Sequence, residues 1–181
     1  QEQEQLKHKR DTFVTQLRKN YPAYAAIRYP QPLRVSDLTL QPQEVLLEYE
    51  VTEHATFAWL LRSQHVVKFV TIPVTRAALH EQVTRYRGFF AGIRNDPNLA
   101  RADLARFDPQ VGKHLYDLLV ADVTPLLQPG ERLIVIPDEI LGVLPFETLV
   151  MALPTTPAQD LGPHGPSPRG VRYLGDVYPI S

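Results

Sequence analysis

Cysteine is missing from this sequence of 181 residues. Without a thiol the chain can form no disulfide, no thiolate metal site and no cysteine nucleophile, and this composition fits a cytoplasmic setting. No apolar run approaches the roughly 20 residues needed to span a bilayer, so no membrane partner is expected. The formal net charge of −1 gives no general attraction to nucleic acids, and no nucleic-acid partner is expected either.

Motifs of several common chemistries are also missing. There is no Gly-x-Ser-x-Gly nucleophile elbow, no glycine-rich phosphate loop and no internal repeat. The composition is ordinary for a globular protein, with 44% hydrophobic and 22% charged residues. A chain of this length holds one domain with a sizeable core, or one domain with an appendage. We expect no cofactor.

Residues 1–40 predict a helical lead-in and a proline-rich connector. Helix-forming residues run to about residue 20, and their apolar members are spaced for one face: Leu6, Phe13, Val14 and Leu17. Tyr21-Pro22 should end or kink this helix, because proline disfavours a helical residue before it. Pro30 and Pro32 indicate an extended link, and Ser36 is placed to cap a short turn over residues 37–40.

Residues 45–72 predict three antiparallel strands joined by hairpins. In the first strand every second residue is apolar, which predicts a buried face made of Val45, Leu47, Tyr49 and Val51. Phe57, Trp59 and Leu61 alternate in the second strand, and residues 66–72 supply the third. We assign Trp59 to the core, with a partner-binding role as the alternative.

Two helices are predicted after the strands. Thr75 is placed to cap a helix that runs to about residue 90 and buries Leu79, Val83, Tyr86 and Phe90. Residues 95–98 form a turn cluster. Asp108 and Pro109 then open a second helix as cap and first residue, with an apolar face made of Val111, Leu115, Leu118, Leu119 and Val123. Residues 128–130 turn the chain toward another strand.

Residues 133–149 read Leu-Ile-Val-Ile-Pro-Asp-Glu-Ile-Leu-Gly-Val-Leu-Pro-Phe-Glu-Thr-Leu. The four leading apolar residues predict a strand buried on both faces, as in a parallel sheet covered by helices. Pro137 and Asp138 stop the strand, Gly142 allows a tight turn, and Pro145 suits the first position of a helix. Such an edge is where α/β folds usually place their chemistry. We therefore predict an α/β fold with a mainly parallel sheet and helices, preceded by the antiparallel strands and the N-terminal helix.

Beyond this run, residues 154–170 are rich in proline and glycine and predict an exposed loop or a partly disordered excursion. Residues 171–180 regain apolar character and predict another strand.

In this order the elements resemble the N-terminal half of a CHAT domain, a caspase-like domain associated with HetF and tetratricopeptide repeats. Four stretches carry the resemblance: residues 21–33, residues 45–49 with the strand at 57–59, residues 133–149 and residues 173–181. The third stretch is similar to the family pattern of a strand followed by Pro-Asp-x-x-Leu-x-x-Leu-Pro-Phe-Glu-x-Leu. Glu139 departs from that pattern, because the family often has glycine there, and the type of turn is therefore in question.

The resemblance implies that the intact parent is a caspase-like cysteine endopeptidase that acts on a peptide substrate with a His-Cys dyad. It also implies tetratricopeptide or other helical repeats upstream, which sense a protein partner. Family members carry the dyad histidine in a His-Gly pair at a strand end and the cysteine at a later strand end. Both would lie downstream of Ser181, so no catalytic residue is assigned to this chain. The alternative is a non-catalytic interaction module or a degenerate pseudo-peptidase.

The expected organisation is a helical lead-in over residues 1–40 and the N-terminal half of a CHAT domain over residues 41–181, with the proline-rich loop at 154–170. Strands of the missing half should pair beside residues 133–136 and 171–180. Their absence would leave open sheet edges and exposed apolar surface. We therefore expect either dimerisation through that edge or a partner segment that fills it.

Histidines offer no site of their own. His164-Gly165 matches the family's catalytic dipeptide, but it lies in Gly-Pro-His-Gly-Pro with no strand before it, which predicts an exposed loop histidine. Four others are predicted at hairpin tips or on separate helices, without the spacing of a helical zinc site: His54, His65, His80 and His114. No metal site is expected.

Two pairs of carboxylates remain as candidates. Glu48 and Glu50 share the polar face of the first strand, where they suggest an acid-base pair or simply a solvated face, and we favour the solvated face. Asp138 and Glu139 crown the strand at 133–136, which is a better position for function. Even there, an aspartate after proline commonly caps the following turn, and we assign Asp138 that structural role.

Overall fold

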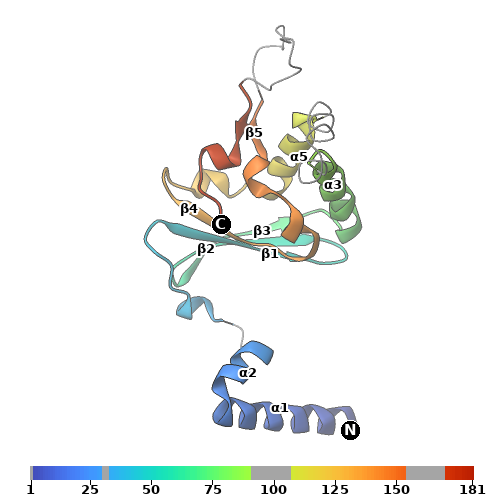
Figure 1. Ribbon diagram of the computed structural model, residues 1–181, viewed down its shortest axis with the longest axis vertical. Helices are drawn as coiled ribbons and strands as arrows, with labels where there is room; N and C mark the ends of the chain where they lie inside the picture. Colours follow the sequence, from blue (N-terminus) through green and yellow to red (C-terminus); the bar gives the residue numbers. More distant parts are fainter. Residues whose placement is uncertain (1, 30–32, 91–106, 154–169) are drawn as a thin grey trace. The chain divides into compact units, whose positions relative to one another are not determined.

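The computed structural model describes residues 2–29, 33–90, 107–153 and 170–181 (Figure 1). The chain divides into two compact units, Gln1–Asp37 and Leu38–Ser181. It has an N-terminal helix and a sheet with both parallel and antiparallel strands, which confirms the predicted α/β class. Among the described strands the sheet is mixed and not mainly parallel, because the antiparallel strands belong to the same sheet as the parallel pair. Within these residues every helix is too short or too polar to cross a membrane.

The first unit contains two helices, α1 (Glu2–Asn20) and α2 (Pro22–Arg28). The predicted break at Tyr21-Pro22 is confirmed, and Pro22 opens α2, because a missing N–H is tolerated in the first turn of a helix. Val14 and Ala25 are buried. Other apolar side chains of the two helices stay largely exposed, among them Leu6, Phe13, Tyr24 and Ile27.

The connector after α2 is only partly described. Pro30 and Pro32 lie outside the described residues. Ser36 was predicted to cap a turn over residues 37–40, and this is wrong: it lies inside a 3₁₀ turn, η1 (Val35–Asp37). Its hydroxyl donates to the carboxylate of Asp37 at 3.1 Å. The N–H of Asp37 donates to the carbonyl of Arg34 at 2.8 Å, which closes the turn earlier in the chain than predicted.

The second unit is built on a four-stranded sheet in the order β3-β2-β1-β4. The predicted antiparallel strands are β1 (Glu44–Val51), β2 (Thr56–Arg62) and β3 (His65–Ile72), and they pair as a meander. Strand β4 (Arg132–Ile136) pairs with β1 in parallel. Parallel neighbours require a long crossover, and the described residues between β3 and β4 form two α-helices of this crossover.

Those helices are α3 (Arg76–Gly88) and α5 (Pro109–Leu119), and they lie on one face of the sheet (Figure 1). Both predicted caps are confirmed: the side chain of Thr75 accepts the N–H of Ala78 at 3.3 Å, and Asp108 accepts that of Gln110 at 2.9 Å. The predicted turn cluster at residues 95–98 lies outside the described part of the chain.

After β4 the chain forms two short 3₁₀ turns, η4 (Glu139–Val143) and η5 (Phe146–Thr148), and then strand β5 (Val150–Ala152). The predicted helix from Pro145 is therefore wrong. Five side chains in this stretch are buried: Leu141, Leu144, Phe146, Leu149 and Val150. The N–H of Leu174 donates to the carbonyl of Leu149 at 2.8 Å, and Val150 pairs with Tyr173, so these long-range contacts hold the chain extended where the sequence predicted a helix.

The predicted strand at 171–180 is also interrupted. Strand β6 spans Arg172–Tyr173 and pairs with β5, and a 3₁₀ turn, η6 (Leu174–Asp176), follows it. The carboxylate of Asp176 accepts the N–H of Tyr173 at 2.8 Å, which folds the chain back at this point. The chain then bonds in parallel fashion to the free edge of β4, where the N–H groups of Leu133 and Val135 donate to Pro179 and Ser181 at 2.9 Å. The predicted loop at 154–170 lies, except for Gly170, outside the described residues.

The core lies between the helices and the sheet face that carries Val45, Leu47, Tyr49 and Val51, as predicted for β1. We call the opposite face the outer face. It carries alternate residues of each strand: Leu46, Glu48 and Glu50; Phe57, Trp59 and Leu61; Phe69 and Thr71; Ile134 and Ile136. The prediction that β4 is buried on both faces is wrong, since Ile136 is 43% exposed. In the second unit, no described helix covers the outer face.

Candidate functional site at the carboxyl edge of the sheet

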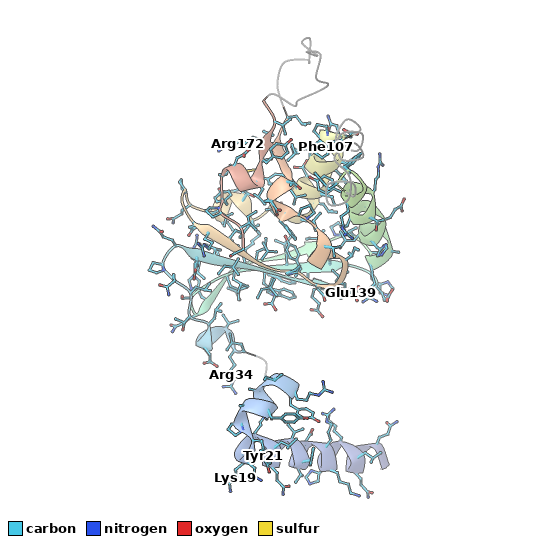
Figure 2. All side chains as sticks on the ribbon, in the orientation of Figure 1. Lys19, Tyr21, Arg34, Phe107, Glu139 and Arg172 are labelled. Carbon is cyan, nitrogen blue, oxygen red and sulfur yellow. The ribbon has the colours of Figure 1, made fainter. Side chains whose placement is uncertain are left out.

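The carboxyl ends of β1 and β4 lie at the same edge of the sheet because the two strands are parallel. Three segments meet there: the turn after β1, the start of α3 and the η4 turn after β4. Figure 2 shows Glu139 at this edge, and its ion pair with Arg76 places it at the N-terminal start of α3. The predicted candidates Asp138 and Glu139 are therefore brought together with residues that are distant in sequence.

Asp138 binds the end of a neighbouring strand. Its Oδ2 atom accepts the N–H of Val51, the last residue of β1, at 2.8 Å. The pairing of β1 with β4 ends where Glu48 lies opposite Ile136, so β4 offers no acceptor this far along. Asp138 makes no side-chain cap bond to η4, and the predicted capping of the following turn is therefore wrong. Its structural role is to terminate β1.

Arg76 connects the three segments. Its guanidinium pairs with Glu53 in the turn after β1, and Nη2 donates to the carbonyl of Val51 at 3.2 Å. Nε lies 2.9 Å from Oε2 of Glu139, close enough for an ion pair although the angle does not make a hydrogen bond. A cation in the first turn of a helix opposes the helix dipole, and here two carboxylates offset that cost.

Glu139 has a φ of 46°, in the left-handed region that favours glycine. This conformation turns the chain from β4 into η4 and points the carboxylate at Arg76. The position is therefore one where glycine would fit without strain, which accounts physically for a glycine in the pattern that the sequence resembles.

The arrangement is suited to fixing strand ends. The carboxylate of Asp138 is engaged by a backbone N–H, and the charge of Arg76 is matched by two glutamates. Within the described ranges no group of three or more metal-ligating side chains is gathered. The cluster fixes the carboxyl ends of β1 and β4 and the start of α3 next to one another.

The predicted histidine positions remain separate from this edge cluster and from one another. Four are exposed, on the β1–β2 turn, at the start of β3, on α3 and on α5: His54, His65, His80 and His114. The ring of His65 lies 3.0 Å from the carbonyl of Ser63. His164 lies outside the described residues.

Glu48 and Glu50 project from the outer face of β1 and are exposed, which fits the solvated-face reading. Their cross-strand neighbours on β2 are Trp59 and Phe57. Trp59 was assigned to the core, and this is wrong, because it is only partly buried and lies on the outer face. The inner positions of β2 hold smaller side chains, those of Thr56, Ala58 and Leu60. Both faces of β2 are apolar, so alternation alone could not identify the inner one.

Two buried tyrosines make hydrogen bonds that the sequence did not predict. Tyr49 donates to the carbonyl of Leu119 at 2.9 Å, and Tyr86 donates to that of Thr148 at 2.6 Å. Burial raises the pKa of both phenols, that of Tyr86 to about 12 even though the hydrogen bond with Thr148 acts in the opposite direction. Their apolar spacing marked both residues as core, but the distant carbonyl partners leave no local signal.

A second missed contact lies at the other end of β4, where this strand begins. Glu131 is 7% exposed and forms a two-pronged ion pair with Arg62, with distances of 2.8–3.2 Å between nitrogen and oxygen atoms. It also accepts the N–H of Gln128 at 2.7 Å. The pair binds the end of β2 to the turn before β4. An acidic residue directly before an apolar strand was the available signal.

No match to this chain was found among family models, curated proteins or solved structures. The resemblance to the CHAT domain therefore stays a prediction from the sequence.

Proposed function

We propose that this chain is the structural N-terminal part of a CHAT-domain protein, and that the intact protein is a caspase-like cysteine endopeptidase. One observation carries the proposal beyond the sequence pattern. Residues 179–181 run in parallel along the free edge of β4, with Leu133 paired to Ile180. A parallel sheet that grows at this edge is what a caspase-like catalytic half requires.

In this proposal the chain supports the chemistry and does not perform it. A histidine and a cysteine at the carboxyl ends of further parallel strands would lie at the same end of the sheet as Asp138, which follows β4, and Arg76, the first residue of α3. Asp138 and Arg76 both contact the backbone of Val51, and these contacts fix the carboxyl end of β1 beside that of β4. The chain has no cysteine of its own to act as nucleophile.

The test begins with the coding sequence downstream of codon 181. The proposal expects an apolar strand that ends in His-Gly and a later strand that ends in cysteine. The longer protein should then react with a thiol-directed peptidase probe and cleave peptide substrates, and replacement of that cysteine by alanine should abolish both activities. A continuation without both residues, or a stop codon, would overturn the peptidase proposal.

The runner-up is a non-catalytic interaction or scaffold module. Helices α1 and α2 leave apolar side chains exposed, and stacking of these side chains against further helical repeats is compatible with either proposal. The two proposals differ in the fate of the sheet edge formed by residues 179–181, which pair with β4. A scaffold whose edge stays open should dimerise or capture a partner segment, and sedimentation of the chain at several concentrations would detect the dimer.

A further inference from the structure

The outer face of the sheet carries a patch of side chains that no described helix of the second unit covers. Strand register aligns its side chains in rows, of which one contains Phe69, Trp59, Glu48 and Ile136. The next row contains Thr71, Phe57 and Glu50. We call the six residues Glu48, Glu50, Phe57, Trp59, Phe69 and Ile136 the aromatic patch.

Its three rings contact one another. Ring centroids are 5.3 Å apart for Trp59 and Phe69, 5.9 Å for Phe57 and Phe69, and 6.3 Å for Phe57 and Trp59. Phe69 nevertheless remains 50% exposed and Ile136 43% exposed. Clustered aromatic side chains that stay in water are typical of binding surfaces, because their burial by a partner releases free energy that the monomer has not used.

Two carboxylates lie inside this apolar surface. Glu48 is placed between Trp59 and Ile136, and Glu50 lies opposite Phe57. Among the described ion pairs, none involves Glu48 or Glu50. The register places no lysine or arginine in either row. The patch therefore offers rings and negative charge together.

This charge selects the kind of partner. Nucleic acids and anionic membranes would be repelled, and a second copy of the same face would bring four carboxylates into one interface. We propose that the aromatic patch docks a basic amphipathic helix of a partner protein, with apolar side chains on the rings and lysine or arginine on the two glutamates. The inner face of the same sheet is already covered by helices, so the packing geometry is one that the sheet supports. The inference does not depend on the peptidase proposal.

Trp59 makes the test direct, because it is the single tryptophan of the chain. The probe is a synthetic helix of about 18 residues, or five turns, with leucine on one face and lysine on the other. Titration into the full chain should shift Trp59 emission to shorter wavelength and reach saturation, and added salt should weaken binding. The same helix with glutamate in place of lysine should leave the emission unchanged.

Two variants locate the binding site. Glu48→Gln combined with Glu50→Gln should weaken binding roughly 3- to 10-fold, and Phe69→Ala roughly 10-fold. The matched control combines Glu81→Gln with Asp122→Asn, which removes the same charge from exposed positions elsewhere. It should bind like the unaltered chain. Circular dichroism confirms that each variant is folded.

Three results would overturn the proposal: no change in Trp59 emission with the lysine helix, equal weakening in the control variant, or equal binding of the glutamate helix. Concentration-dependent dimerisation that Phe69→Ala abolishes would also overturn it, because the patch would then be the interface with a second copy.

Discussion

At the scale of single residues, Glu139 sets backbone strain against an ion pair. Its φ of 46° costs a residue with a Cβ about 1–2 kcal/mol relative to glycine. Its ion pair with Arg76 is partly exposed and contributes about 0–1 kcal/mol. Glycine gives back part of the gained stability because it also loosens the unfolded chain. The cost of the strain and the gain from the ion pair are therefore of similar size. Whether a substitution raises or lowers the free energy of unfolding depends on whether it removes the strain.

This balance gives a prediction for two variants. Glu139→Gly should leave the free energy of unfolding unchanged or raise it slightly, because the strain disappears with the ion pair. Glu139→Ala should lower it by about 1 kcal/mol, because alanine loses the ion pair and keeps the strain. Urea denaturation measures both. A glycine variant that is less stable than the alanine variant would show that the entropy which glycine adds to the unfolded chain outweighs the strain that it removes.

At the scale of elements, two helix glycines provide a matched comparison. A Cβ on Gly112 in α5 would lie 3.0 Å from Cγ2 of Val150 and 3.1 Å from Cε2 of Tyr86, and both neighbours are fully buried. A Cβ on Gly88, the last residue of α3, would meet nothing within 4 Å. Alanine improves helix propensity by up to about 1 kcal/mol at either position. Only at Gly112 does crowding oppose this gain.

We therefore expect Gly88→Ala to keep or slightly raise the thermal midpoint. Gly112→Ala should lower the free energy of unfolding by about 1 kcal/mol, because overpacking of a tight core costs about 1–3 kcal/mol and outweighs the gain in propensity. Thermal and urea unfolding of the two variants side by side check this. If Gly112→Ala is as stable as Gly88→Ala, α5 can move away from Val150 and Tyr86.

Elements with a local signal were predictable. Alternating or continuous apolar residues predicted the meander and strand β4, and the residue types at the helix starts predicted the caps Thr75 and Asp108. The structure contains all of these. The interrupted stretch after Pro145 was not predictable, because the pairing of β5 with β6 decides it. The inner face of β2 was ambiguous, since Leu60 and Trp59 offer apolar surface on both sides.

At the candidate site the sequence located the correct edge but not its contacts. Asp138 was singled out from its position after a strand, whereas its acceptor role toward Val51 joins residues that lie far apart in the chain. Arg76 had only the weak signal of a cation at the start of a helix. Long-range hydrogen bonds of this kind are fixed by topology, and a single sequence does not encode them locally.

At the scale of the whole molecule, Tyr86 makes the free energy of unfolding depend on pH in the alkaline range. Burial raises the pKa of its phenol to about 12 from the ordinary 10, so the folded state retains this proton over a range in which the unfolded chain has lost it. The stabilisation is present in full below pH 10 and is lost as the pH rises through 12. Two pKa units correspond to about 2–3 kcal/mol. The pKa of Tyr49 is raised as well and adds to the loss.

The free energy of unfolding should therefore fall steeply between pH 10 and 12. Urea titrations at pH 8, 10, 11 and 12 measure it. Tyr86→Phe should be less stable at pH 8 by about 1 kcal/mol, because the carbonyl of Thr148 loses its donor. Above pH 10 its stability should fall less steeply than that of the unaltered chain. An identical slope in both proteins would show that Tyr86 does not carry the effect.

The position of β1 at the centre of the sheet also bears on the order of folding. Its antiparallel partner β2 follows within a few residues, whereas its parallel partner pairs Glu44 with Arg132. Closing the longer loop costs more chain entropy, so the meander should assemble first and β4 later. In the interval, one side of β1 presents unpaired backbone groups, and newly made chains would be most vulnerable there to joining one another through intermolecular strands.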